Sequence, residues 1–187
     1  MHFVQLLKVT PFYWVSQQNG ASEVYKINKN IRDTIYNKSN YDDVKWLVTP
    51  NWQAKGYRLP TEAEWEFAAS GGNKPKGFEY SGSDDIEKVA WYSRNSDSKT
   101  HPVRRLKANE LGLFDMSGNV WEWCYDWYAE YNILSNNNPT GAQEGSNCVV
   151  RGGSWYYKGK YCWVANRYDF NPDIRSYDVG FRCVRYD

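Results

Sequence analysis

The feature that most constrains the fold is that helix signals are confined to one short stretch, residues 60–72. Thr61 is placed to cap a helix N-terminus, and Glu64, three residues later, completes a capping box. Gly71 and Gly72 are typical of a helix end. Between these signals, apolar residues recur at the i, i+3, i+4 spacing of a buried helix face: Trp65, Ala68 and Ala69. The acidic residues Glu62, Glu64 and Glu66 are expected on different sides of this helix, near its positive end, and not as a catalytic pair.

The rest of the chain reads as short strands separated by turns. Residues 120–124 alternate with period two, so Trp121 and Trp123 share one face and Glu122 lies on the other. Further strands are expected at 3–9, 24–27, 44–48, 148–151 and 179–186, and 135–147 is expected to be a polar loop. We find no internal repeat and no linker. The sequence therefore predicts one α+β domain over 1–187, with one or two helices, short and mostly antiparallel strands, and long loops.

The composition narrows the classes of partner. The chain has 10 Trp and 16 Tyr, yet its mean hydropathy is −0.80, so we expect a core of large amphipathic rings and many rings left at the surface. The formal net charge of +1 favours neither nucleic acid nor an anionic membrane as partner. No run of apolar residues is long enough to span a membrane, and the first nine residues do not form a signal peptide.

Histidine and cysteine usage restricts metal and redox chemistry. Only two histidines are present, His2 and His101, which argues against a multi-histidine zinc or iron site. The cysteines have no C-x-x-C spacing, and two alternatives stay open for them, buried thiols or one to two disulfides. They are Cys124, Cys148, Cys162 and Cys183.

Four motifs occur in order along the chain. Residues 56–66 read GYRLPTEAEWE, 112–123 read GLFDMSGNVWEW, 151–155 read RGGSW, and 180–182 read GFR. Together they resemble the formylglycine-generating-enzyme, or sulfatase-modifying-factor, family over about residues 21–185. The resemblance implies a C-type-lectin-like fold.

The same resemblance bears on catalysis. Enzymes of this family use two cysteines, five residues apart, to bind copper and oxidise a substrate cysteine. Counting back from the GFR motif places these positions at Gly159 and Val164, and Cys162 between them has no thiol partner at that spacing. A second branch couples sulfur to histidine derivatives with iron held by a histidine-rich helical domain, which this chain lacks. We therefore expect no enzyme activity and no cofactor.

The segment 155–181, called the aromatic segment below, has the composition of a binding surface. Nine of its 27 residues are aromatic, without strand or helix period, and small polar residues lie among them. Rigid rings with adaptable polar neighbours are typical of antibody-like contact surfaces. We expect Trp155 and Phe181 in the core and the other rings at the surface.

Within the family, the aromatic segment resembles the variable region of proteins diversified by a retroelement that mutates template adenines, including treponemal surface lipoproteins. The resemblance implies a fixed frame around variable positions. It also implies lipid-anchored display at the cell surface, in the outer membrane, and an unidentified macromolecular ligand, expected to be a protein. The thirteen predicted binding residues are Tyr156, Tyr157, Tyr161, Trp163, Tyr168, Asp169, Phe170, Asn171, Asp173, Ile174, Ser176, Tyr177 and Asp178.

The frame must hold this segment without help from the variable residues. Gly152 and Gly153 are expected to adopt backbone conformations closed to other residues. Framework arginines are expected to tie the loops to carboxylates and carbonyls: Arg151, Arg167, Arg175 and Arg182.

Two calcium-dependent alternatives have some support in the sequence. Asn119 and Glu122 could ligate a structural calcium ion, but a buried Glu122 paired with a framework arginine is favoured. Residues 171–173 (NPD) superficially resemble the sugar-binding motif of true C-type lectins, which also need a second Asn-Asp pair. A calcium-dependent lectin is therefore the weaker reading.

Overall fold

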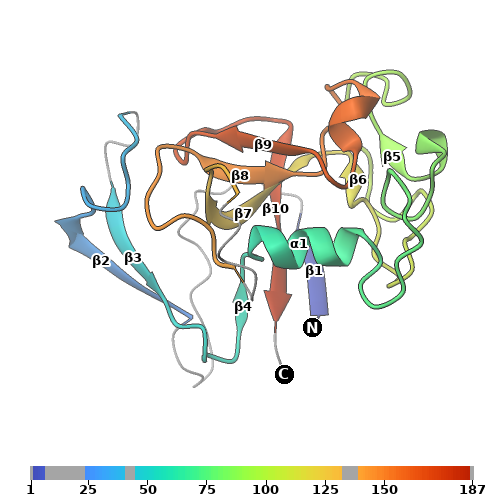
Figure 1. Cartoon of the computed structure of the whole chain (residues 1–187). Helices are drawn as coiled ribbons and strands as arrows, with labels where there is room; N and C mark the ends of the chain where they lie inside the picture. The colour runs from blue at the N-terminus through green and yellow to red at the C-terminus, as the bar shows by residue number, and fades with distance from the viewer. Residues whose placement is uncertain (1, 7–23, 41–44, 132–138, 186–187) are drawn as a thin grey trace.

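A computed structural model describes residues 2–6, 24–40, 45–131 and 139–185. Its centre is a mixed sheet in the order β1-β10-β7-β8-β9, with the short strand β4 also paired to β10 (Figure 1). These strands are β1 (His2–Leu6), β4 (Tyr57–Arg58), β7 (Trp121–Trp127), β8 (Cys148–Arg151), β9 (Arg167–Phe170) and β10 (Val179–Arg185). All neighbours are antiparallel except β10 and β7, which run parallel.

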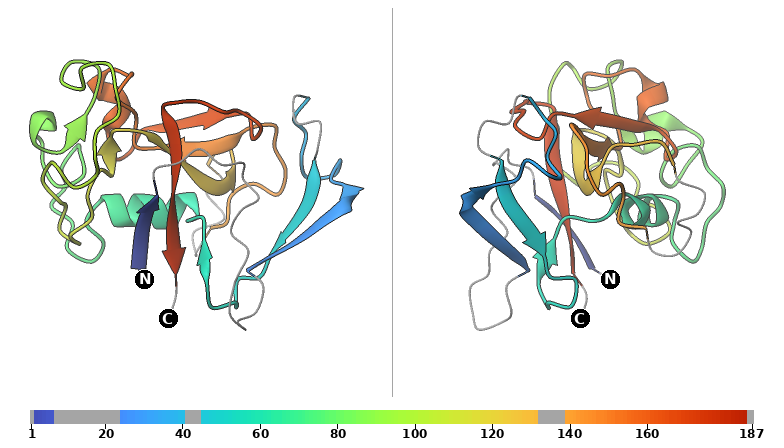
Figure 2. Two further views of the ribbon diagram at one scale, coloured as in Figure 1. Left: turned by 180° about the vertical axis from the view of Figure 1, so that it is seen from behind. Right: turned by 60° about the vertical axis from the view of Figure 1, so that its left-hand side comes forward.

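Two smaller strand pairs flank this sheet. The antiparallel pair β2 (Tyr25–Arg32) and β3 (Trp46–Pro50) stands to one side of it, as Figure 2 shows. The parallel pair β5 (Ala90–Trp91) and β6 (Ser117–Gly118) lies at the opposite side of the molecule. Two 3-10 turns, η1 (Ile86–Lys88) and η2 (Gly159–Cys162), complete the regular structure.

The helix α1 (Glu62–Ala69) confirms the capping prediction. The hydroxyl of Thr61 accepts a hydrogen bond from the Glu64 amide, and the Glu64 carboxylate accepts one from the Thr61 amide. The predicted apolar face, Trp65, Ala68 and Ala69, is buried. The capping box thus starts the helix where it can lay this face against the sheet.

The core has a layer on each face of the central strands. Cys124 and Val149 pack with α1 residues on one face, whereas Trp121, Trp123 and Val150 pack with rings of the aromatic segment on the other. The period-two prediction for residues 120–124 is therefore confirmed. Because both faces of β7 are covered, Trp121–Cys124 are all buried.

The α+β prediction is confirmed, but the aromatic segment is more ordered than its pattern indicates. It contains η2 and β9, and β9 pairs with β8 along its whole length. The ladder is set by partners on β8, so local periodicity does not reveal it. Of the predicted strand at 3–9, residues 3–6 belong to β1, and 7–9 lie outside the described residues, as do 44 and 135–138.

Candidate ligand-binding surface

The floor of the surface is a group of aromatic rings around the buried Trp121. Tyr168 stacks on Trp121 at 5.4 Å between ring centroids, and Tyr157 meets it edge-on at 5.5 Å. Tyr161 and Phe170 complete the ring contacts at 6.3 Å each. These four predicted binding residues are half-buried, so each offers only part of its ring to a ligand.

The rim carries the exposed rings. Tyr177 is 70% exposed and Tyr156 is 60% exposed, and both contact Trp155, at 5.5 and 5.6 Å between centroids. Trp163 is also exposed, and its indole Nε1 donates to the Tyr80 hydroxyl at 3.1 Å. Tyr80 is a neighbour that sequence reasoning missed, because it lies 83 residues away in the chain. Together these rings offer contact area at low entropic cost to a partner.

The predicted binding residues without a ring differ in depth. Asp173 and Ile174 are exposed, and Asp169, Asn171 and Ser176 are half-buried. The Asp169 carboxylate accepts a hydrogen bond from the Asn147 amide group.

Asp178 lies deepest of the polar predicted residues. It is 5% exposed, and its carboxylate accepts hydrogen bonds from Ser154 and Ser176. The structure therefore places Asp178 beneath the surface, where it joins the RGGSW turn to the end of the aromatic segment.

Arg151 holds the aromatic segment from below. Its side chain is fully buried, stacks over Trp65, and donates to the Val164 carbonyl at 3.0 Å and to the Asn166 carbonyl. It also pairs with two carboxylates of α1, Glu66 through a hydrogen bond and Glu62 at 3.2 Å from Nε. The fully buried guanidinium is thus neutralised and anchors the chain between η2 and β9.

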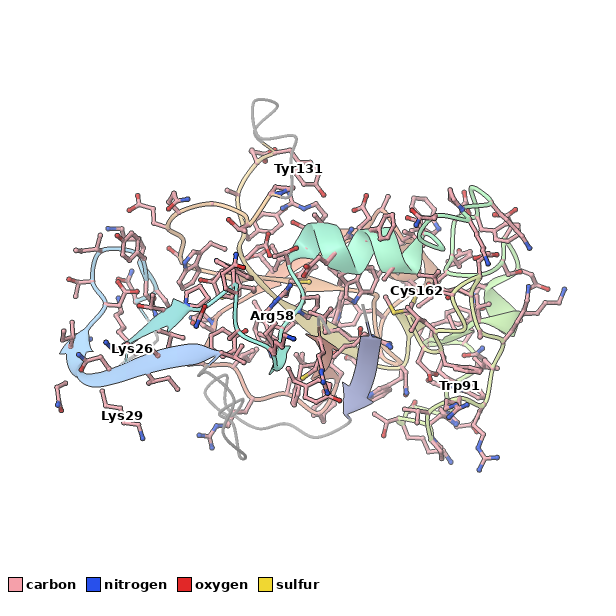
Figure 3. The ribbon with its side chains drawn as sticks, turned by 90° about the horizontal axis from the view of Figure 1, so that it is seen from below. Lys26, Lys29, Arg58, Trp91, Tyr131 and Cys162 are labelled. Atoms are coloured by element: carbon pink, nitrogen blue, oxygen red, sulfur yellow. The ribbon has the colours of Figure 1, made fainter. Side chains whose placement is uncertain are left out.

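Arg167 makes the second anchor. It donates to both oxygens of Glu62, at 2.6 and 2.7 Å, and to the Ala129 carbonyl at 3.0 Å. Its guanidinium lies over the rings of Tyr128 and Tyr131, and Figure 3 shows Tyr131 beside α1. The planar, multidentate group fits this setting in a way that lysine could not.

The third anchor is the pair Arg182 and Glu122. Arg182 donates to both Glu122 oxygens at 2.9 Å and to the Phe114 carbonyl, and Trp65 Nε1 donates to Glu122 at 2.8 Å. Both charged side chains are almost completely buried. The favoured prediction for Glu122, a buried carboxylate paired with a framework arginine, is confirmed.

The prediction that the three acids of α1 lie on different sides is wrong for two of them. Glu62 and Glu66 both reach Arg151, because residues four apart on a helix share a face. Glu64 points elsewhere and binds Arg58 through two hydrogen bonds of 2.7 and 2.6 Å. The i, i+4 spacing was the signal that could have identified this pair.

The turn at Gly152 and Gly153 has the backbone that was expected. Their φ angles are +95° and +76°, which side-chain-bearing residues rarely adopt. A Cβ on Gly153 would lie 2.8 Å from the Tyr161 carbonyl oxygen and from Cys162 Sγ. The turn therefore lets η2 approach the end of β8.

All four cysteines lie within the described residues and are buried thiols, not disulfides. Burial raises the pKa of Cys162 to about 12 and that of Cys183 to about 11, and it also raises the pKa of Cys124. A protonated, enclosed thiol is a poor nucleophile and a poor metal ligand. Gly159 begins η2 and Val164 is buried in the core layer on the α1 side.

Asn119 and Glu122, the possible calcium ligands, form hydrogen bonds with other groups of the protein. The Asn119 side chain accepts from the His101 amide and donates to the His101 carbonyl, and Glu122 binds Arg182 and Trp65. Among the described residues, no group of three or more His, Cys, Asp or Glu is arranged to hold a metal ion. Within the same residues, no helix is both long and apolar enough to cross a membrane.

Comparison with known proteins identifies relatives that include enzymes and a variable protein. The chain is 36% identical to the structure of Treponema denticola variable protein 1, with a TM-score of 0.72, covering 87% of this chain and 62% of that one. It is 39% identical to the chaperone protein LppX of Paenibacillus barcinonensis, over 86% of this chain and 60% of the relative. It is 37% identical to the formylglycine-generating enzyme of Streptomyces coelicolor, over 69% of this chain and 46% of the enzyme.

The chain thus spans less than two thirds of each of these relatives. The family described as sulfatase-modifying factor enzyme 1-like domain matches residues 13–186, nearly the whole sequence. The predicted fold, the four motifs and the buried arginine pairs agree with this match. The chain belongs to the formylglycine-generating-enzyme, or sulfatase-modifying-factor, family, and its fold is similar to that of the treponemal variable protein.

Proposed function

We propose that this chain is a non-catalytic ligand-binding protein whose aromatic segment is diversified by a retroelement to bind varied protein partners. One observation carries the proposal. The framework side chains Arg151, Arg167 and Arg182 bind carboxylates and backbone carbonyls, and none of these partners is one of the thirteen predicted binding residues. The exposed rings can therefore be exchanged while the frame stays intact.

The absence of catalysis in this proposal is supported by the thiol chemistry. Cys162 is the single cysteine of the aromatic segment, and the residues five positions before and after it are Tyr157 and Arg167. Its thiol is buried, its pKa is raised to about 12, and the aromatic segment contains no histidine that could act as a base. A bis-thiolate copper site has no second sulfur here.

Display at the cell surface through a lipid anchor is part of the proposal, and it follows from the resemblance of the aromatic segment to the variable region of retroelement-diversified surface lipoproteins. Brief treatment of intact source cells with a non-permeant protease should remove the chain. Persistence of the chain in intact cells, with loss only after lysis, would contradict surface display.

The diversification is tested by sequencing the 3′ end of the gene across many cells of the source population. We expect substitutions to concentrate in the codons of the thirteen predicted residues, at positions where a template has adenine. Asp178 is expected to vary least, because its buried carboxylate holds Ser154 and Ser176. Invariant codons, or variation at all bases alike, would show that the retroelement does not act on this gene.

An enzyme of the formylglycine-generating type is the second candidate, favoured by the 37% identity to such an enzyme. Incubation of the copper-supplied chain with a cysteine-containing sulfatase peptide distinguishes the two. We expect the peptide mass to stay unchanged, and conversion of the cysteine to an aldehyde would identify an enzyme.

We propose that binding needs no cofactor. Addition of EDTA should leave the melting temperature and partner binding unchanged. A fall of several degrees would indicate a structural calcium ion, and loss of glycan binding would indicate a calcium-dependent lectin.

A further inference from the structure

An exposed apolar cluster lies outside the aromatic segment, around the end of β2. Ile31, Ile35 and Tyr36 are 49%, 65% and 45% exposed and fall within six residues of one another. Single exposed apolar residues are common on protein surfaces, whereas a contiguous group of them marks an interaction site more often. These three residues belong neither to the aromatic segment nor to the framework that holds it, so the proposed function does not explain their exposure.

The loop 33–40, which carries two of these residues, is held by the rest of the molecule. The Asp33 carboxylate accepts from the Tyr36 amide at 2.8 Å. Two backbone bonds then join it to Gly145, from Gly145 N to the Tyr36 carbonyl at 3.0 Å and from Lys38 N to the Gly145 carbonyl at 2.8 Å. The Lys45 ammonium donates to the Asn37 carbonyl at 3.1 Å. Ile35 and Tyr36 are thus presented on a preorganised loop, which lowers the entropic cost of binding.

The same loop contacts the aromatic segment directly. Ser39 is 1% exposed, and its hydroxyl donates to the Asn171 side-chain oxygen at 2.8 Å. Asn171 follows β9 and is one of the thirteen predicted residues, 132 positions away in the chain. The loop and the proposed binding surface are therefore continuous.

The charges of this region indicate the kind of partner. Lys26, Lys29 and Arg32 of β2 are exposed, and Figure 3 shows the two lysines along β2 at the edge of the molecule. A protein whose apolar patch is bordered by carboxylates would match both the apolar cluster and these cations.

We propose that the loop 33–40 is a second wall of the binding surface, lying outside the diversified segment. On this proposal, which rests on the proposed function, Ile35 and Tyr36 contact the same protein partner as the aromatic segment. Ser39 is a positioning residue that fixes Asn171 against the loop. The partner is a folded protein with an apolar patch and an acidic border.

The test uses binders made from this chain. The full chain is displayed on phage with Tyr156, Trp163, Asp173, Ile174 and Tyr177 randomised, and it is selected against the acidic protein ovalbumin. Each selected clone is then given Ile35→Asp, Tyr36→Ser or the control Phe67→Asp, since Phe67 on α1 is also an exposed apolar residue, at 49%. We expect the two loop substitutions to weaken ovalbumin binding at least tenfold, the control to stay within twofold, and all melting temperatures to stay within about 2 °C of the parent clone.

A second measurement separates positioning from folding. Ser39→Ala should weaken binding in clones that keep Asn171 but not in the same clones carrying Asn171→Ala, because only the former lose the hydrogen bond between Ser39 and Asn171. In the ovalbumin complex, the amides of residues 33–40 should also gain protection from hydrogen exchange.

The outcomes distinguish the two proposals. Binders that tolerate Ile35→Asp and Tyr36→Ser within twofold would refute the second wall and leave the proposed function standing. Failure to select any binder would contradict the proposed function and, with it, this inference.

Discussion

Glu62 is the residue on which the frame most depends, because its carboxylate contacts both Arg151 and Arg167. The three charges are largely shielded from water, so each compensates the desolvation of the others. Removing one partner leaves a buried charge without compensation, which costs more than an exposed ion pair contributes. Stability at this scale therefore depends on a few buried charges.

The substitution Arg167→Ala should destabilise the chain without changing which partners it binds. Its two hydrogen bonds to Glu62 are lost, and we expect the free energy of unfolding to fall by about 3 kcal/mol. For a chain of this size the melting temperature should fall by roughly 6–12 °C. Urea denaturation and calorimetry measure both. Arg175, which was also expected to be a framework arginine but is exposed, provides the control. Arg175→Ala should change the free energy of unfolding by less than about 0.5 kcal/mol. An equal loss in both variants, or altered partner choice in Arg167→Ala, would contradict the assigned role.

Asp126 should make stability depend on pH. Burial raises the pKa of its carboxyl from the ordinary 3.8 to about 7 in the folded chain. The folded state therefore keeps a proton that the unfolded state releases above about pH 4, and stability falls as the pH rises from 4 through 7. The effect of this group is at most about 4 kcal/mol.

The variant Asp126→Asn isolates this effect. An asparagine oxygen can still accept the hydrogen bond from the Glu62 amide, which is 2.7 Å long in the native chain. We expect the variant to be more stable than the native chain at pH 8 and similar to it near pH 4. Urea titrations of both proteins across this range provide the comparison, and parallel pH profiles would show that Asp126 is not the titrating group.

At the scale of elements, α1 combines a local interaction, its capping box, with ion pairs to residues that are distant in the sequence. Its start is set by the Thr61 capping box, and its carboxylates then reach Arg58, Arg151 and Arg167. The helix thus serves as the lower support of the aromatic segment, although it contributes no residue to the proposed binding surface. A change at the cap should weaken this support without altering the rings above it.

Thr61→Ala should lower the free energy of unfolding by about 1 kcal/mol, because the Glu64 amide loses its acceptor. Thr61→Ser keeps the hydroxyl and should restore most of this stability. Circular dichroism during urea titration provides the measurement. If the serine variant were as unstable as the alanine variant, packing and not capping would be the cause.

At the scale of the whole molecule, the aromatic segment has a structural floor and an exchangeable rim. Tyr168 packs on the buried Trp121, whereas Tyr177 is 70% exposed above Trp155. Both were predicted as binding residues, so the same residue type serves two physical roles in one segment. Ligand specificity should therefore reside mainly in the rim and in the adjoining loop 33–40.

Tyr177→Ser should change the free energy of unfolding by less than about 0.5 kcal/mol, as expected for an exposed residue. Tyr168→Ser should cost about 2 kcal/mol, because it removes a ring stacked on the core. Chemical denaturation of the two variants at one pH makes the comparison. Equal costs would show that floor and rim do not differ energetically.

Whether the sequence by itself determined a feature depends on how far apart along the chain the interacting residues lie. The capped helix, the alternation along β7 and the glycine turn after β8 rest on neighbours a few residues apart, so they could be predicted. The pairing of Glu122 with an arginine was also predictable in kind, because a buried carboxylate needs a cation, although the partner Arg182 lies 60 residues away.

Only the tertiary structure decided which rings are floor and which are rim. The pairing of β9 with β8 half-buries Tyr168 and Phe170. Asp178, which was predicted to be a binding residue, is buried, and its carboxylate accepts hydrogen bonds from Ser154 and Ser176. The contact between Ser39 and Asn171 joins segments 132 residues apart. Such contacts depend on how distant strands pack, and no local pattern of side chains encodes that packing.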